Sequence, residues 1–163
     1  AMSTDDVRPI VIEDLPEADF RVAVGYLDDA RRECQLVLVA RDQGRATDPV
    51  VARVATRLVP AIEAVGDAFL AAEVTSDGVG SLRLRGAMDA EQAAAVAELQ
   101  VQLVQLRSLV RRGDLLLDSE PAVAALITWL CEEVADQLAG RAPRPYIAAG
   151  PVRPTAERSH AAA

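Results

Sequence analysis

The sequence Gly113-Asp-Leu-Leu-Leu-Asp-Ser-Glu-Pro121 opens a stretch that continues through Trp129 and ends at Pro143-Arg-Pro-Tyr146. Proline is well tolerated in the first turn of a helix, and glycine after the last turn suits a left-handed cap. A helix is therefore expected between Pro121 and Gly140, with Asp118 or Ser119 as its cap. Its apolar residues recur at three- and four-residue steps, at Val123, Leu126, Ile127, Leu130, Val134 and Leu138.

Three earlier segments have the same helical period. Their first turns are predicted at Asp19, at Asp48 followed by Pro49, and at Asp89 followed three residues later by Gln92. Gly44 and Gly113 are expected to end the first and the third of these helices. Ala, Val and Leu dominate the composition while aromatic residues make up 3%, which favours helices packed through aliphatic side chains.

Short β-strands are predicted at residues 9–13 and 81–85, and residues 115–117 form a third strand or an extended link. A lone strand leaves its backbone groups unpaired, so residues 81–85 should pair with one of the other two segments. The predicted fold class is mainly α, a four-helix bundle-like domain with two or three short strands as a minor cap. We expect a flexible N-terminus at residues 1–8, a single helical domain at residues 9–146 and a disordered tail at residues 147–163.

The charge of the chain is unevenly distributed. Residues 141–163 hold four arginines against one glutamate, so this segment carries +3 and the rest of the chain carries −11. An acidic surface repels phosphate backbones, and nucleic acid is therefore not expected as a partner. The longest uncharged run of note is also too short to cross a bilayer, so no membrane partner and a cytoplasmic location are expected.

The residues needed for many kinds of catalysis are missing from the body of the chain. All seventeen basic residues are arginine, and the one histidine is His160 in the tail, which argues against lysine chemistry, Ser-His or Cys-His pairs and histidine zinc sites. Cys34 and Cys131 are interpreted as buried small hydrophobes rather than a disulfide. Glu132 and Asp136 could bind a hard cation, but a solvated acidic face is the preferred interpretation. We expect no enzyme activity, no cofactor and no metal.

The third predicted helix has an unusual second face. Besides its main apolar face it presents Ala94, Ala97, Val101 and Val104, and no charged residue lies between Glu98 and Arg107. Such a helix is either central in the bundle or a seam in a dimer.

Five residues are candidates for contact with a protein partner: Arg111, Arg112, Trp129, Glu133 and Tyr146. The two arginines either complement the negative end of the helix dipole or bind a partner's carboxylate. Trp129 lies on the flank of the fourth helix, where it either forms part of an interface or covers the bundle edge and anchors the tail.

Several segments in the last third of the chain form one recognisable pattern: Leu109-Val-Arg111-Arg-Gly113, the run to Pro121, Trp129-Leu130, Glu133, Gln137-Leu-Ala-Gly140 and Pro143-Arg-Pro-Tyr146. Taken together, they resemble a helical regulatory domain of actinobacterial proteins. In that family the domain accompanies an ATP-binding module similar to the anti-sigma-factor kinases (GHKL type) of partner-switching systems. The resemblance implies a non-catalytic signalling role in stress or developmental transcription control, with an anti-sigma-type ATP-binding regulator as protein partner. No ATP site is implied, because the nucleotide-binding motifs are absent. The alternative is a small-molecule sensor that binds an apolar ligand within the bundle.

Overall fold

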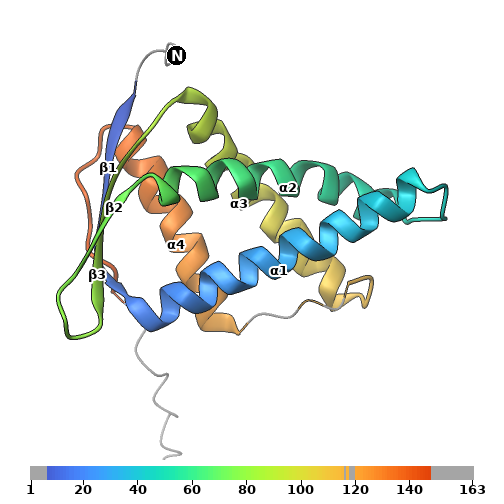
Figure 1. Ribbon diagram of the computed structural model, residues 1–163, viewed down its shortest axis with the longest axis horizontal. Coiled ribbons are helices and arrows are strands. Elements are labelled where there is room, and N and C mark those ends of the chain that lie inside the picture. Colours follow the sequence, from blue (N-terminus) through green and yellow to red (C-terminus); the bar gives the residue numbers. More distant parts are fainter. Residues whose placement is uncertain (1–6, 116, 118–119, 148–163) are drawn as a thin grey trace, which may run out of the picture.

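The computed structural model describes residues 7–115, 117 and 120–147, and this part of the chain is mainly helical (Figure 1). The elements are β1 (Arg8–Pro16), α1 (Glu17–Asp42), α2 (Pro49–Leu70), β2 (Glu73–Ser76), β3 (Ser81–Met88), α3 (Ala90–Arg111) and α4 (Pro121–Leu138). Arg8, predicted to belong to the flexible N-terminus, is the first residue of β1 because it pairs with Met88. Residues 1–6 and 148–163, where the rest of that terminus and nearly all of the predicted disordered tail fall, lie outside the described residues.

The three strands form one antiparallel sheet in the order β1-β3-β2, which lies at one end of the helices (Figure 1). Of the two partners considered for residues 81–85, the structure shows residues 9–13, with Ile12 opposite Leu84. Alternate side chains of the two strands enter the core, namely Ile10, Ile12, Leu15, Leu82, Leu84 and Met88.

Two parts of the strand prediction differ from the structure. β2 was not predicted, because its four residues are all exposed and show no apolar alternation. The third strand proposed at residues 115–117 is wrong for the two residues that the structure describes there, since neither Leu115 nor Leu117 pairs with a strand. Leu115 is instead buried in the core.

Local capping signals correctly place the starts of α2 and α3, and α4 begins at Pro121 as predicted, although its N-cap is Glu120. The Asp48 carboxylate accepts hydrogen bonds from Val50 N and Val51 N at the start of α2, and Asp89 forms a capping box with Gln92 at the start of α3. The start of the first helix, predicted with Asp19 as its cap, is three residues late, because the N-cap is Pro16. α1 begins at Glu17 directly after β1, and the Glu17 N–H donates to the Gly80 carbonyl at 2.9 Å instead of to a capping side chain.

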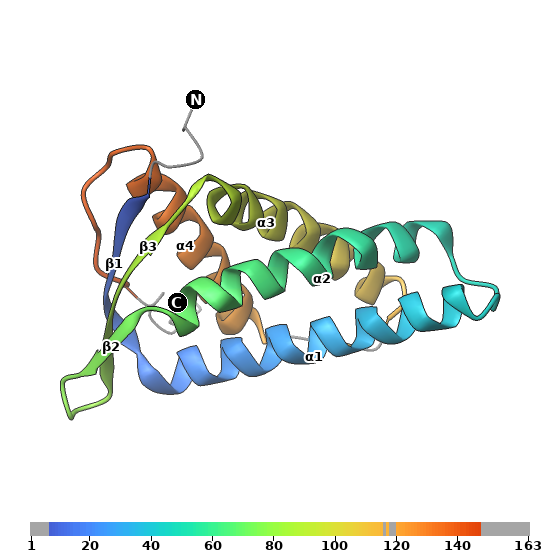
Figure 2. The same ribbon diagram turned by 45° about the horizontal axis from the view of Figure 1, so that its top comes forward.

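The helices pack around a single hydrophobic core that includes residues from β1 to α4. α2 packs on α1 and α3, and α4 packs on the same two helices from the other side. Figure 2 shows α2 between α1 and α3, with α3 along an outer side of the molecule. Among the described residues, none of the helices combines the length and the apolar character that a membrane span requires.

Candidate functional site

The five candidate contact residues do not form one site. α3 runs away from the sheet, so Arg111 and Arg112 lie at the end of the molecule remote from it (Figure 1). α4 returns toward the sheet, and Trp129, Glu133 and Tyr146 contact the segment that follows α4 or belong to it. The five residues that the sequence predicts as partner contacts therefore lie at two separate places in the fold.

The segment after α4 folds back beside β1, and we call residues 141–147 the C-terminal clasp (Figure 1). The Tyr146 N–H donates to the Glu13 carbonyl of β1 at 3.3 Å. The Tyr146 ring meets the Trp129 ring edge to face, with centroids 4.9 Å apart and an interplanar angle of 63°. Of the two roles considered for Trp129, the structure shows contact with the returning tail.

Glu133 is not a surface residue. Its side chain is 0% exposed, and its carboxylate accepts hydrogen bonds from Arg144 N at 2.8 Å, Arg144 Nε at 3.0 Å and Gln137 Nε2 at 2.8 Å. A buried carboxylate is tolerated when it has such donors and a paired charge. The prediction that Glu133 contacts a partner is therefore corrected, because its carboxylate already holds the clasp on α4.

Gln137 protects the edge of the sheet. Its amide accepts from Val11 N at 2.9 Å and donates to Val11 O at 2.7 Å, on the side of β1 that faces away from β3. A strand edge with unpaired backbone groups can recruit another chain, and here a side chain takes the place of the missing strand. Sequence reasoning assigned Gln137 no role, although Glu133 and Gln137 lie four residues apart on the core side of the predicted helix. That spacing is the signal that could have found this pair.

Asp136 also belongs to the clasp. Its carboxylate binds Arg144 at 2.8 Å and makes a closer contact with Arg141. The hydrogen bond from Arg141 is the main cause that lowers the pKa of Asp136 below its ordinary value. Asp136 is thus paired with arginines rather than with the exposed Glu132, and no cluster able to hold a metal occurs among the described residues.

The face of α3 opposite the core is exposed and apolar. We call Ala94, Ala97, Val101 and Val104 the α3 outer face; Val101 is 55% exposed and Val104 is 57% exposed. The buried residues of the same helix lie on its other side, at Val96, Leu99, Leu103, Leu106 and Leu109. α3 is therefore not enclosed on all sides by the described part of the chain, and the dimer seam considered for this helix stays a prediction.

The charges that border the α3 outer face are directed elsewhere. Glu98 accepts a hydrogen bond from Gln102 at 2.8 Å and lies 3.7 Å from Arg57 of α2. Arg107 extends toward α4, where its Nη2 lies 3.3 Å from Thr128 Oγ1. The α3 outer face is consequently uncharged over about two and a half helical turns.

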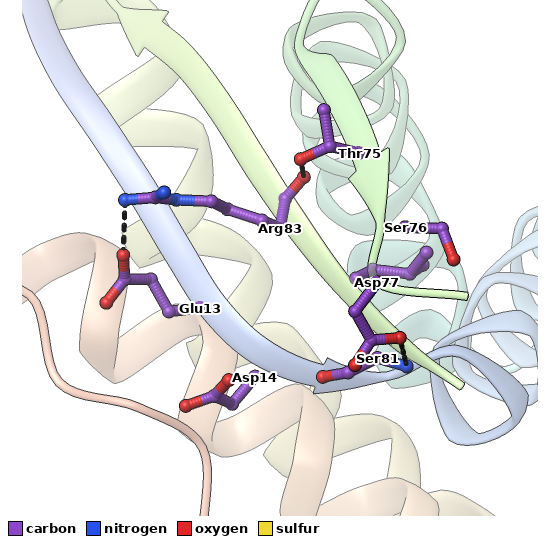
Figure 3. Close-up of a pocket in the computed structure, with 8 residues that line it drawn as sticks. Glu13, Asp14, Thr75, Ser76, Asp77, Ser81 and Arg83 are labelled. Atoms are coloured by element: carbon purple, nitrogen blue, oxygen red, sulfur yellow. Dashed lines mark hydrogen bonds and ion pairs between the residues drawn. The ribbon is translucent and has the colours of Figure 1, made fainter. Parts of the chain in front are cut away.

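A polar groove opens beside the β2–β3 turn (Figure 3), with a volume of about 340 Å³. Glu13 forms an ion pair with Arg83 across the sheet at 2.5 Å, and Thr75 Oγ1 donates to the Arg83 carbonyl. The Asp77 carboxylate accepts from Val79 N and Ser81 N, and these backbone hydrogen bonds, Ser81 first, lower its pKa. The groups in the groove thus bind one another, and the sequence had indicated only the turn.

A small apolar hollow lies between the sheet and α2. The hollow there has a volume of about 20 Å³ and is lined by Ile10, Ile12, Ala68, Phe69, Ala72, Leu84, Gly86, Ala87 and Met88. Ligand pockets commonly measure roughly 300–1,000 Å³, so this hollow gives the small-molecule sensor alternative little support.

The two cysteines are free and buried, as the sequence predicted. Burial raises the pKa of each thiol to about 11. A thiol with such a pKa is almost entirely protonated at neutral pH and is a poor nucleophile.

No family model, curated protein or solved structure matches this chain. The resemblance to a partner-switching regulatory domain rests on the residues between Leu109 and Tyr146.

Proposed function

We propose that this chain is a non-catalytic, cytoplasmic regulatory module, four-helix bundle-like in architecture, that acts through protein contact at the α3 outer face. The observation that carries this proposal is the exposure of Val101 and Val104 at 55% and 57% in an uncharged stretch of helix. Contiguous exposed apolar residues with a polar rim are typical of protein interaction sites. The partner class is an anti-sigma-type ATP-binding regulator of stress or developmental transcription in actinobacteria.

Electrostatics support a contact at this face. The chain has a net charge of −8, so contact through most of its surface would meet repulsion from another acidic protein. The α3 outer face avoids this repulsion because it carries no carboxylate and the bordering Glu98 is directed toward Arg57 of α2. Arg111 is exposed where α3 ends and can meet a carboxylate of a partner, whereas the exposed Arg112 forms an ion pair with Asp114 at 3.0 Å.

The state of the reactive groups supports binding rather than catalysis. Cys34 and Cys131 are buried with raised pKa values, and the Glu133 and Asp136 carboxylates are held by arginines of the clasp. These groups stabilise the fold in their present positions.

The proposal is tested by measuring binding of a purified anti-sigma-type ATP-binding regulator to the immobilised chain. Val104→Arg places a charge in the α3 outer face and should weaken binding at least tenfold. Leu36→Arg is the matched control, because Leu36 is a 70% exposed apolar residue on another helix. Equal binding by wild type and Val104→Arg, or no binding by the wild type, would count against the proposal.

A further inference from the structure

We infer that the α3 outer face binds a second copy of this chain, with the two α3 helices antiparallel and Val101 of one copy facing Val104 of the other. The inference rests on the proposed contact role of the α3 outer face, and it assigns a second copy of the chain to this face when the regulator is absent. It also gives the regulator a competitor, since both would cover the same side chains.

The spacing of the exposed residues is that of a helix–helix seam. Steps of three and four residues connect Ala94, Ala97, Val101, Val104, Ser108 and Arg111. This is the pattern of the two apolar positions in a heptad repeat, which keeps one stripe facing a partner helix. Here the stripe lies opposite the core-facing residues of the same helix, so the pattern is not explained by the fold of the single chain.

Charge favours a second copy in the antiparallel orientation. Two parallel α3 helices would place Arg111 of one copy against Arg111 of the other, and like charges at such a distance are destabilising. In the antiparallel arrangement Arg111 of one copy lies beside Ala94 of the other, whose small side chain leaves space for it. Arg112, which forms an exposed ion pair with Asp114 at 3.0 Å, then also approaches Glu91 of the other copy, an exposed carboxylate in the first turn of α3. The same arrangement places the uncharged middle sections of the two α3 helices against each other.

The size of the seam sets the expected strength. α3 has 22 residues and is therefore about 33 Å long. A single pair of helices of this length buries less surface than a standard protein interface, so we expect a dissociation constant of about micromolar order. Such a dimer can exchange with another protein that binds the same face.

Cysteine cross-linking of the isolated full chain tests the orientation directly. Ala97 of one copy should face Ser108 of the other, so an equimolar mixture of Ala97→Cys and Ser108→Cys chains should form a disulfide-linked dimer under mild oxidation. Neither variant alone should do so, because equal positions are separated by about 11 residues, or roughly 16 Å, along the seam. A disulfide requires Cα atoms within about 7 Å. The native Cys34 and Cys131 are buried and should not interfere.

Each outcome of the cross-linking experiment tests either the dimer or the orientation of its two α3 helices. A cross-linked species from the mixture alone supports the antiparallel seam. Rapid cross-linking of Ala97→Cys alone would overturn the orientation, and no cross-linking in any sample would overturn the dimer. Because no regulator is present, these results are separate from those of the binding experiment, and regulator binding by a strictly monomeric chain would leave the proposed function standing.

Discussion

The carboxylate of Glu133 is fully buried in α4, yet the arginine that neutralises it, Arg144, lies eleven residues later in an exposed segment. Both the backbone N–H and the Nε of Arg144 donate to this carboxylate. The burial of Glu133 therefore depends on the clasp, and the clasp is held to the helices by Glu133. This mutual dependence makes the C-terminal clasp part of the folded domain.

Arg144→Ala should destabilise the protein by about 2 kcal/mol, because it leaves a buried carboxylate without its paired charge. The loss is smaller than for a fully buried pair, since the Arg144 side chain is 57% exposed and its backbone donor remains. Urea unfolding measures the change. Arg141→Ala is the control and should cost less than about 1 kcal/mol, because it removes an exposed ion pair.

The double variant Glu133→Gln/Arg144→Ala identifies the cause. Without a buried charge, the loss caused by Arg144→Ala should largely disappear relative to Glu133→Gln alone. If Arg144→Ala costs as much in the Glu133→Gln background as in the wild type, the ion pair is not the source of the stability.

Gln137→Ala should expose the edge of β1, because both Val11 backbone groups lose their partner. We expect a loss of about 2 kcal/mol, as for buried polar groups left without a hydrogen bond. Hydrogen exchange at the Val11 amide measures the local effect and should accelerate more than exchange at Leu84 in the centre of the sheet. The exposed Gln105→Ala is the control. Unchanged protection of Val11 in Gln137→Ala would show that the glutamine does not cover the edge.

The clasp should loosen in acid. The pKa of Asp136 is lowered in the folded chain, chiefly by the hydrogen bond from Arg141, so its stabilising effect is present above the unfolded pKa of about 3.8 and is lost as the pH falls through the lowered folded value. Trp129 is the only tryptophan and contacts Tyr146, so its fluorescence reports on the clasp. A fluorescence change below about pH 4 is expected, and Asp136→Asn should weaken this pH dependence. An identical acid profile in Asp136→Asn would contradict this assignment.

The native thiols should be inert until the chain unfolds. Folding raises the pKa of Cys34 and Cys131 from 9.0 to about 11. The stability that these two thiols contribute should therefore be fully present below pH 9 and should be lost as the pH rises through about 11. Thiol labelling at neutral pH should be slow in buffer and fast in urea. Rapid labelling of the native chain would show that at least one cysteine is accessible.

Much of the fold could be predicted because its signals are local. Asp48-Pro49 and Asp89 with Gln92 place the starts of α2 and α3, and the alternation of residues 81–85 finds β3. The start of α1 was missed because it depends on a contact between Glu17 and Gly80, which are distant in the sequence. β2 was missed because an exposed edge strand has no apolar pattern to detect.

The candidate site was harder to predict from sequence for the same physical reason. Glu133 could be placed on a helix, but its burial depends on Arg144, which lies beyond the end of that helix. The two faces of α3 were visible as periodicity, while only the packing of α2 and α4 shows which face remains exposed. Local patterns therefore gave the elements, and tertiary contacts decided which residues can meet a partner.

The most direct test of the inferred α3 seam is the mass of the chain in solution, measured by light scattering over a series of micromolar concentrations. The wild type should approach twice the chain mass of 17.3 kDa as the concentration rises. Val104→Arg should remain at the mass of one chain, and Leu36→Arg should behave as the wild type does. A wild-type mass of one chain at every concentration, or equal dimerisation by Val104→Arg, would contradict the inferred seam.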